Sequence, residues 1–345
     1  MITDKPICVT GASGFIASWV VRELLENGYA VRATVRGLTE GNKYEYLTSL
    51  PGATDRLELV QAELLTKGSY DKAVADCEYV MHTASPYVLD VNDSQQDLLD
   101  PALKGTLNVL KACTKAGSVR KVVLTSSVAA IYGEPISGHV YTEEDWNETS
   151  SLTRNPYFYS KTMAERSAWD FIEQKNTNFE MVVINPTVVI GPSLVPSLNT
   201  SNQILRDVLA GTYPMIMSLS WGFVDVRDVA HSHILAMESE KAKGRYLCNS
   251  ETLSMSDVVN ILREAGYNNY KLPKIKMTGT IGNALVKILV ITQPKGVRTF
   301  IRTHVGRSAK YDNSKIRQDF EMTFRPIKGS ILEAVEDVIR WKHIP

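Results

Sequence analysis

The sequence is poor in the features that mark secreted, metal-binding or disulfide-rich proteins. Only four of its 345 residues are cysteines, no two of them have a Cys-x-x-Cys spacing, and each lies in or beside an apolar stretch. This pattern predicts buried, reduced thiols, no metal site and no disulfide framework, and it favours a cytoplasmic protein. The four residues are Cys8, Cys77, Cys113 and Cys248.

An excess of charge of one sign is also missing. The chain carries 38 basic and 38 acidic side chains, so its formal net charge is zero. A neutral chain gives no electrostatic reason to expect nucleic acid or an anionic membrane as a partner. The first residues lack the basic region and apolar core of a signal peptide. The apolar run 281–292 contains Lys287 and is too short to span a bilayer, so it predicts a buried or substrate-covering helix.

The arrangement of apolar residues predicts an α/β fold. Short apolar runs alternate with amphipathic stretches through the first half of the chain, which indicates a parallel sheet covered by helices. We therefore expect a Rossmann-type, doubly wound parallel sheet. Strands are expected at residues 7–10, 31–35, 57–61, 79–82, 121–125 and 181–184, and helices at 15–27, 69–75, 95–116 and 156–173.

The alternation decays after Pro186, where proline and glycine interrupt residues 186–222. A strand signal returns at 245–248 and helices follow, which predicts a smaller, mostly helical substrate-binding domain on the carboxyl edge of the sheet. No repeat and no low-complexity linker separates the two domains, so we expect them to be fused. The dinucleotide-binding domain is assigned to residues 1–189 and 220–249, and the substrate-binding domain to 190–219 and 250–345.

A glycine turn follows the first predicted strand, in the segment "ICVTGASGFIASWVV". Gly11 and Gly14 permit a tight turn and a close approach of the backbone to a pyrophosphate, and Ala17 keeps the next helix near the sheet. The N-terminus of that helix faces the anion. The residues expected to bind a dinucleotide here are Gly11, Ser13, Gly14, Phe15 and Ile16.

The end of the second strand indicates which dinucleotide is bound. An NAD site usually has an acid at this point for the ribose hydroxyls, whereas this strand ends in Arg36. Arginine suits a 2′-phosphate, and Lys43 supplies a second cation a short loop away. Together the two residues favour NADPH as the cofactor.

A Tyr-x-x-x-Lys spacing occurs four times in the chain. Such a pair shares one face of a helix, and the ammonium lowers the pKa of the phenol, which favours the phenolate. Two pairs between residues 267 and 274 lie where proline and asparagine break a helix, and the pair at 311–315 is expected far from the nucleotide end of the sheet. Only Tyr157 and Lys161 open a long helix after the fifth strand. Tyr157 is therefore the expected proton donor, and Tyr159 is assigned to helix packing.

The fifth strand ends in "VVLTSSVAA", which brings Thr125, Ser126 and Ser127 to the carboxyl edge of the sheet. Ligands bind at this edge in open α/β sheets. A serine hydroxyl there can hydrogen-bond a substrate carbonyl, a tyrosine can protonate it, and a lysine can hold the charge of the tyrosine and a ribose.

These residues resemble the extended short-chain dehydrogenases/reductases. Within that superfamily the chain is similar to the group of dihydroflavonol reductases, cinnamoyl-CoA reductases and yeast methylglyoxal reductases. The resemblance covers nearly the whole chain. In order, its motifs are "VTGASGFIASWVV", "HTASPYV", "GTLNVLKA", "VVLTSSVAA", "YFYSKTMAERSAW", "NPTVVIGP" and "FVDVRDVA".

The resemblance implies a catalytic triad of Ser127, Tyr157 and Lys161. In such enzymes a hydride moves from C4 of the nicotinamide to a carbonyl carbon while the tyrosine protonates the oxygen. Asn108 matches an asparagine with a structural or water-organising role. The further cofactor-binding residues implied by the resemblance are Glu63, Leu64, Thr83, Ala84, Ser85, Thr125, Pro186 and Val188.

Two departures from the group bear on the substrate. Flavonoid-type reductases often carry asparagine where this chain has Tyr132, and the "Asn-Trp-Tyr-Cys-Tyr" run of cinnamoyl-CoA reductases is replaced by residues 155–159. Both favour an aldehyde or ketone reductase of broader scope over one specific for plant phenylpropanoids. An apolar, aromatic pocket suited to hydrophobic carbonyls is expected. Its lining is assigned to Ser127, Pro86, Tyr87, Val88, Tyr132, Leu194, Trp221 and Phe223.

Several polar residues are expected to be structural. His82 follows an apolar strand and is expected in the core, and His231 and His233 have no metal-like partner, so no zinc is assigned. Asp225 and Arg227 are expected to tie the two domains together through hydrogen bonds.

The leading prediction is an NADPH-dependent reductase of aldehydes and ketones, monomeric or homodimeric. A sugar-nucleotide epimerase or dehydratase shares the fold and the triad but retains NAD, usually with an acid near position 36. A hydroxysteroid-type dehydrogenase would oxidise bulky alcohols with NAD. A regulator that senses NADPH without catalysis commonly lacks the tyrosine or the lysine, which this chain has.

Overall fold

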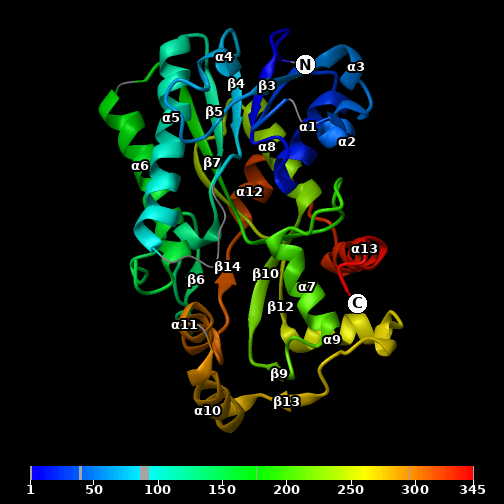
Figure 1. Cartoon of the computed structure of the whole chain (residues 1–345). Coiled ribbons are helices and arrows are strands. Elements are labelled where there is room, and N and C mark those ends of the chain that lie inside the picture. The colour runs from blue at the N-terminus through cyan, green and yellow to red at the C-terminus, as the bar shows by residue number, and fades with distance from the viewer. Residues whose placement is uncertain (1, 39–40, 86–92, 176, 294, 345) are drawn as a thin grey trace.

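A seven-stranded parallel sheet forms the centre of the larger unit in the computed structural model, which describes residues 2–38, 41–85, 93–175, 177–293 and 295–344 (Figure 1). The strand order is β11-β7-β5-β4-β1-β2-β3, so the chain winds outward from β1 in both directions. This order confirms the predicted doubly wound, Rossmann-type sheet. The strands are β1 Ile7–Thr10, β2 Val31–Val35, β3 Leu57–Gln61, β4 Tyr79–His82, β5 Lys121–Thr125, β7 Glu180–Pro186 and β11 Gly244–Cys248.

Helices cover both faces of this sheet. Because successive side chains of a strand point to opposite faces, each strand contributes to two separate hydrophobic cores. In β1, Ile7 and Val9 pack with α1 (Phe15–Glu26) and α8 (Val226–Glu238) on one face. Cys8, between them, points to the other face. That face is covered by α4 (Asp71–Val74), α5 (Asp100–Ala116) and α6 (Pro156–Lys175). Figure 1 shows α5 and α6 together on one side of the sheet.

The four cysteines are all buried and free, as the sequence predicts. Three of them, Cys8, Cys77 and Cys113, lie in the core beneath α4 and α5. They act there as small apolar side chains.

The smaller unit contains two short sheets and most of the remaining helices. Its three-stranded sheet has the order β12-β10-β8, and a two-stranded sheet pairs β13 with β9. A further strand pair, β14 with β6, joins the two units. The elements are β6 Val140–Tyr141, β8 Val188–Ile190, α7 Thr200–Ala210, β9 Met215–Met217, β10 Ser220–Asp225, β12 Glu251–Ser254, α9 Met255–Glu264, β13 Ile275–Met277, α10 Gly279–Leu289, α11 Lys295–His304, β14 Lys310–Tyr311, α12 Ser314–Asp319 and α13 Ile327–Arg340.

Packing divides the chain differently from the predicted domain boundaries at three places, the first being residues 188–189 of β8, which pair with β10 in the small sheet. Residues 220–225 form β10 of the small sheet, and Phe223 lies in the core of the smaller unit. Residues 314–324 return to the larger unit, where Ile316 and Phe320 join the core beside α8 and the ring of Phe320 stacks on Tyr246 at 4.4 Å. All three differences arise from contacts between segments far apart in the sequence.

The apolar run 281–292 is not buried. It forms most of α10 and a short 3₁₀ turn, Val290–Thr292, and within α10 only Gly282 and Val286 are buried. Ile281 is 79% exposed. The first alternative, a buried helix, is therefore wrong, because the helix meets the rest of the chain along one narrow line; the second, a helix that covers the substrate, stays a prediction. Among the residues that the structure describes, no helix is both long and apolar enough to cross a membrane.

Candidate active site

The glycine turn lies against the end of β4. Gly11 has φ of +64°, and a Cβ on this residue would lie 3.0 Å from both Cα and Cβ of Ala84. Thr10 holds the two segments together, since its Oγ1 accepts hydrogen bonds from the backbone N–H groups of Thr83 (3.1 Å) and Ala84 (3.0 Å). A side chain at position 11 would displace this contact.

The first N–H groups of α1 are available to an anion. Gly14 is the N-cap residue and offers no side chain to cap the helix, and Phe15 and Ile16 begin its first turn. Because uncapped N–H groups and the helix dipole both favour negative charge, this end of α1 suits a pyrophosphate. Ser13 lies partly buried within the same turn.

The two cations predicted to select the dinucleotide lie at the surface. Arg36 directly follows β2, is exposed, and makes no ion pair with any residue that the structure describes. Lys43 lies in the 3₁₀ turn Gly41–Tyr44 with its ammonium 5.7 Å from the ring centroid of Tyr44. The position of Arg36 at the carboxyl end of β2 is where a dinucleotide ribose is bound in this type of fold.

The adenine side of the expected site is built on a close contact between a loop and α5. The backbone carbonyl of Leu64 accepts a hydrogen bond from Nδ2 of Asn108 at 3.0 Å. A Cβ at Gly105 would lie 2.6 Å from Cγ of Leu64, so the leucine fits over the glycine. This hydrogen bond supports the structural role, one of the two expected for Asn108, and the exposed Glu63 lies beside this contact.

Tyr157 and Lys161 lie on one face of α6, as their spacing predicts. The ammonium of Lys161 is 5.7 Å from the ring centroid of Tyr157, and it donates a hydrogen bond to Oγ of Ser85 at 2.8 Å. Burial lowers the pKa of Lys161 to about 8, from an ordinary value of 10.5. A buried ammonium of this kind stabilises any negative charge that develops on the neighbouring phenol.

Ser127 stands where β5 ends. Its backbone is extended, and its Oγ accepts a hydrogen bond from the N–H of Ala129 at 3.1 Å, capping the 3₁₀ turn Val128–Ala130. The hydroxyl proton remains available for a carbonyl oxygen. Nδ2 of Asn185, on β7, donates to the Ser127 carbonyl at 3.2 Å and fixes the backbone of this residue.

A buried carboxylate, Glu165, connects α6 to this strand end, and sequence reasoning missed it. Its Oε2 accepts hydrogen bonds from Oγ of Ser126 at 2.5 Å and from Nδ2 of Asn185 at 2.7 Å. Its Oε1 accepts from Nε of Arg245 at 2.6 Å, and the side chains of this ion pair are 0% and 7% exposed. Glu165 lies one turn after Lys161 on the same face of α6, which is the signal that could have identified it. We call Glu165, Ser126, Asn185 and Arg245 the clamp.

Arg245 is held from several sides. Its guanidinium donates to the backbone carbonyls of Glu143 at 2.8 Å and Asp145 at 2.6 Å. It also lies 3.9 Å from the ring centroid of Trp146. The clamp is therefore anchored to the loop before α6 as well as to β11.

Two buried histidines are structural. Nδ1 of His233 donates to the carbonyl of Val229 at 2.7 Å, so its Nε2 accepts from the hydroxyl of Thr125, also at 2.7 Å. Burial lowers the pKa of His233 to about 4. His82 lies in the core against Thr10, as expected, and burial followed by the charge of Lys161 lowers its pKa to about 3. Thr125, predicted to bind cofactor, thus uses its hydroxyl to hold α8.

The aromatic residues expected near the substrate are split between two places. Tyr132 lies in a cluster with Tyr141, Phe158 and Tyr311, and its hydroxyl accepts a hydrogen bond from that of Tyr311 at 2.9 Å. Tyr311 was expected far from this edge of the sheet, and that expectation is wrong because the pairing of β14 with β6 brings it back. Phe223 is fully buried in the core of the smaller unit, so it does not line a pocket.

The other predicted pocket residues are placed as follows. Trp221 is buried beside Phe223, with ring centroids 6.1 Å apart, and Leu194 is partly buried in the segment after β8. Pro186 is buried at the end of β7, and Val188 begins β8 partly buried. Pro86, Tyr87 and Val88 lie outside the described residues.

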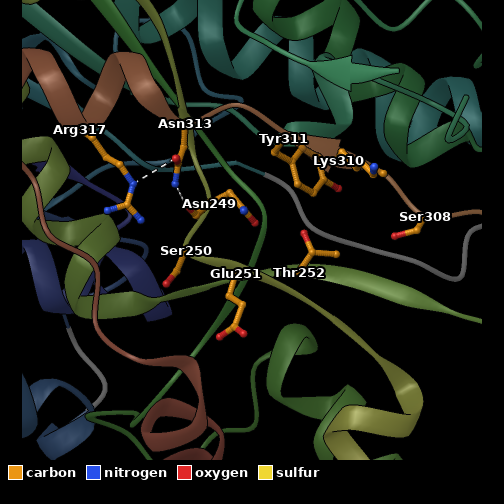
Figure 2. A pocket seen from close by; sticks show the side chains of 10 residues that line it. Asn249, Ser250, Glu251, Thr252, Ser308, Lys310, Tyr311, Asn313 and Arg317 are labelled. Carbon is orange, nitrogen blue, oxygen red and sulfur yellow. Dashed lines mark hydrogen bonds between the residues drawn. The ribbon is translucent and has the colours of Figure 1, made fainter. Parts of the chain in front are cut away.

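A cavity of about 440 Å³ opens between β12 and the segment that leads from β14 into α12 (Figure 2). Thr252, Lys310, Asn313 and Arg317 contribute to its largely polar lining. Tyr311, in the wall of this cavity, lies close to Thr187, the residue between the predicted cofactor-binding residues Pro186 and Val188. A Cβ at Gly222 would lie 2.6 Å from Tyr311 and 2.9 Å from Thr187. None of the described residues predicted to line the substrate pocket lines this cavity, so the expected apolar, aromatic pocket stays a prediction.

The predicted link between the units is present. Nε of Arg227 donates to Asp225 at 2.9 Å, and its Nη2 reaches both Asp225 (2.8 Å) and Glu333 of α13 (2.5 Å). Asp225 also caps α8 by accepting from the N–H of Arg227. No group of three or more potential metal ligands is found in the described part of the chain.

Comparison with known proteins places this arrangement in a family. The model of the NAD dependent epimerase/dehydratase family matches residues 7–261, which is most of the chain. The chain belongs to this family. The resemblance to extended short-chain dehydrogenases/reductases inferred from the motifs is thereby confirmed.

The similar members of the NAD dependent epimerase/dehydratase family include reductases. The chain is 47% identical over 275 residues to cinnamoyl-CoA reductase CAD2 of Medicago truncatula, covering 78% of this chain and 82% of that protein. It is 40% identical over 282 residues to the bifunctional dihydroflavonol 4-reductase/flavanone 4-reductase of Malus domestica, covering 78% of each. The chain is thus a reductase-type member of the family.

Solved structures agree in fold over the full length. Yeast methylglyoxal/isovaleraldehyde reductase Gre2, complexed with NADPH, superposes with a TM-score of 0.80 at 29% identity and covers 98% of this chain and 99% of that chain. Gre2 of Candida albicans, also in complex with NADPH, has a TM-score of 0.78 at 33% identity, covering 97% and 99%.

Proposed function

We propose that this protein is an NADPH-dependent reductase that converts aldehydes or ketones to alcohols, with Tyr157 as the proton donor. The observation that carries the proposal is the buried Lys161, whose ammonium lies beside the ring of Tyr157 and bonds Ser85 next to the glycine turn. This geometry links a proton donor directly to a dinucleotide-binding edge.

The residues around the glycine turn fit NADPH. Gly11 leaves the backbone bare where a Cβ would collide with Ala84, the open end of α1 accepts the pyrophosphate, and Arg36 is free to meet the 2′-phosphate. The Gre2 structures described above were solved with NADPH. When bound, NADPH supplies the hydride for the carbonyl carbon.

The side chains divide the remaining work between them. Ser127 donates a hydrogen bond to the carbonyl oxygen and orients it, and Tyr157 transfers its proton to that oxygen as the alkoxide forms. The positive charge of Lys161 stabilises the phenolate left behind. The clamp keeps the strand end that carries Ser127 in register with α6, since Glu165 bonds Ser126 and Asn185.

The surroundings of these groups support a substrate class. Tyr132 and Phe158, which adjoins Tyr157 in sequence, offer aromatic surface, while the cavity near Tyr311 is polar. A carbonyl compound with an apolar part near the reacting carbon and a polar end suits both. The relatives named above, which include cinnamoyl-CoA and dihydroflavonol reductases, support a carbonyl substrate of moderate size.

The test is oxidation of NADPH, followed by absorbance, with a panel of aldehydes and ketones. Wild type is compared with Tyr157→Phe and with Tyr159→Phe, a control that removes a hydroxyl two residues away on another face of α6. We expect turnover by wild type and Tyr159→Phe and its loss in Tyr157→Phe. NADPH binding without turnover on any carbonyl would contradict the proposal and favour a nucleotide sensor.

Cofactor choice is tested separately with Arg36→Ser. Loss of a charge-assisted hydrogen bond of about 1.5–3 kcal/mol lowers kcat/KM with NADPH by about tenfold to a hundredfold, while the value with NADH changes little. A wild-type enzyme that strongly prefers NADH would overturn this assignment and favour a relative of the NAD-dependent epimerases or hydroxysteroid dehydrogenases.

A further inference from the structure

Exposed apolar side chains gather in one part of the smaller unit. Of the 12 large hydrophobic residues that are exposed in the described part of the chain, seven lie between residues 275 and 297. They occupy β13, α10, the turn after it and the start of α11. The seven are Ile275, Ile281, Leu285, Ile288, Leu289, Ile291 and Val297.

The outward side of α10 is apolar along its length. Gly282 and Val286, one turn apart, face the protein, while Ile281, Leu285 and Ile288 repeat at helical spacing on the exposed side. A helix that is apolar on both sides needs a cover, because monomeric proteins rarely leave a continuous apolar surface of more than a few hundred Å² in water.

The same segment is strongly basic, although the chain as a whole is neutral. Residues 271–311 contain nine lysines and arginines and no aspartate or glutamate. Lys274, Lys276 and Arg302 are exposed and Lys287 is partly buried, and none of the four makes an ion pair with a described residue. We call these four cations and the seven apolar residues the basic apolar face.

The basic apolar face lies at one end of the molecule. Figure 1 shows β13, α10 and α11 at the end opposite the strands and helices of the N-terminal region. A flat surface can therefore approach this end without meeting the large sheet.

We propose that the basic apolar face docks on an anionic lipid bilayer, with Ile281, Leu285 and Ile288 in the interface and the cations among the headgroups. Amphipathic helices with basic residues beside an apolar face bind membranes in this way, lying in the plane of the surface. Anionic headgroups attract each nearby lysine or arginine. The zero net charge of the chain had argued against such a partner, but it conceals this local excess.

The positive charge of the basic apolar face argues against a second copy of the chain as the partner that covers this face. A two-fold dimer places the same patch of both subunits face to face. Here it would bring two sets of unpaired cations together with no carboxylate between residues 271 and 311 to offset them. Lipid headgroups of opposite charge provide that compensation.

The test is co-sedimentation of the full chain with vesicles of phosphatidylcholine alone and of phosphatidylcholine mixed with phosphatidylserine. We expect binding to the mixed vesicles that weakens as salt is added. Lys274→Gln and Lys276→Gln should each weaken binding about fivefold. Ile281→Ser combined with Ile288→Ser should weaken it about tenfold or more.

Matched controls lie elsewhere on the surface. Lys111→Gln on α5 and Ile2→Ser change an exposed cation and an exposed isoleucine far from this end, and they should leave binding unchanged. All variants should retain NADPH-dependent turnover in solution, which shows that they fold. Absence of binding to mixed vesicles, or binding that ignores Ile281 and Ile288, would overturn the proposal. A dimer in analytical ultracentrifugation that Ile281→Ser dissociates would overturn it too, in favour of self-association.

Discussion

Removing the carboxylate of Glu165 is the most informative perturbation of this site, because the clamp joins stability to the alignment of the catalytic groups. Loss of one partner of a buried ion pair costs about 3–5 kcal/mol, since it leaves the other charge buried and unpaired. In Glu165→Leu, Arg245 keeps its bonds to two backbone carbonyls and its contact with Trp146. We therefore expect a loss near the lower end, about 3 kcal/mol, in the free energy of unfolding measured with urea.

The double variant Glu165→Leu with Arg245→Met separates the two roles. It removes both charges, so the free energy of unfolding should return to within about 1–2 kcal/mol of wild type. Ser126 and Asn185 still lack their acceptor, and misplacement of Ser127 should keep kcat lower by on the order of tenfold to a hundredfold, with NADPH affinity unchanged. Recovery of kcat along with stability in the double variant would refute the clamp as a positioning device.

Ser126→Ala provides an independent measurement. It removes only the 2.5 Å bond to Glu165 and leaves the ion pair intact. A smaller loss of kcat than in the double variant is expected, with little change in unfolding. Combined with Glu165→Leu, it should add almost nothing to the loss of kcat, because both changes break the same bond.

Two further predictions concern Lys161 and Gly105. The pKa of Lys161 is lowered to about 8, so its ammonium is present below pH 8 and kcat/KM should fall as pH rises through that value. Between pH 8 and 10.5 Lys161 is protonated in the unfolded chain but not in the folded chain. The free energy of unfolding should therefore rise with pH by about 1.4 kcal/mol per pH unit in this range. A Lys161→Met variant should lack both the fall in kcat/KM and the rise in stability. Gly105→Ala places a Cβ 2.6 Å from Leu64 and should cost about 1–3 kcal/mol in urea unfolding. Gly329→Ala, whose Cβ meets nothing within 4 Å on α13, should instead be neutral or stabilising by up to about 1 kcal/mol, and equal effects would contradict the packing argument.

The sequence predicted the large sheet well because its signals are local. The first five strands begin and end at the predicted residues, since each is a short apolar run closed by polar or turn residues. β7 is longer than expected, running from 180 to 186 rather than 181 to 184, because its ends continue to pair with β5 and β11, and β11 begins one residue earlier than expected, at Gly244, which pairs with Val182. Pairing with a neighbour extends a strand beyond what its own residues indicate.

Site residues that belong to a sequence motif could be predicted, whereas residues that reach the site only through tertiary contacts could not. Tyr157 and Lys161 were found from their spacing and from the strand before them. Glu165 was not, because an acidic residue on a helix usually faces water, and its partner Arg245 is 80 residues away. Tyr311 was misplaced because its position depends on the pairing of β14 with β6, which no local pattern reveals.

The passage of the chain between the two units limits how they can move. β7 leads into β8 with only Thr187 between them, and Thr187 bonds Asn249, which accepts in turn from Asn313 at 2.5 Å. Hydrogen bonds thus join three segments in which the chain passes between the two units, at Thr187, Asn249 and Asn313. Neither unit can be excised as a continuous fragment. A wide rotation of one unit away from the other would break the hydrogen bonds between these three segments. The enzyme should therefore melt in a single step despite having several cores, and its substrate should enter by local displacement of side chains and loops.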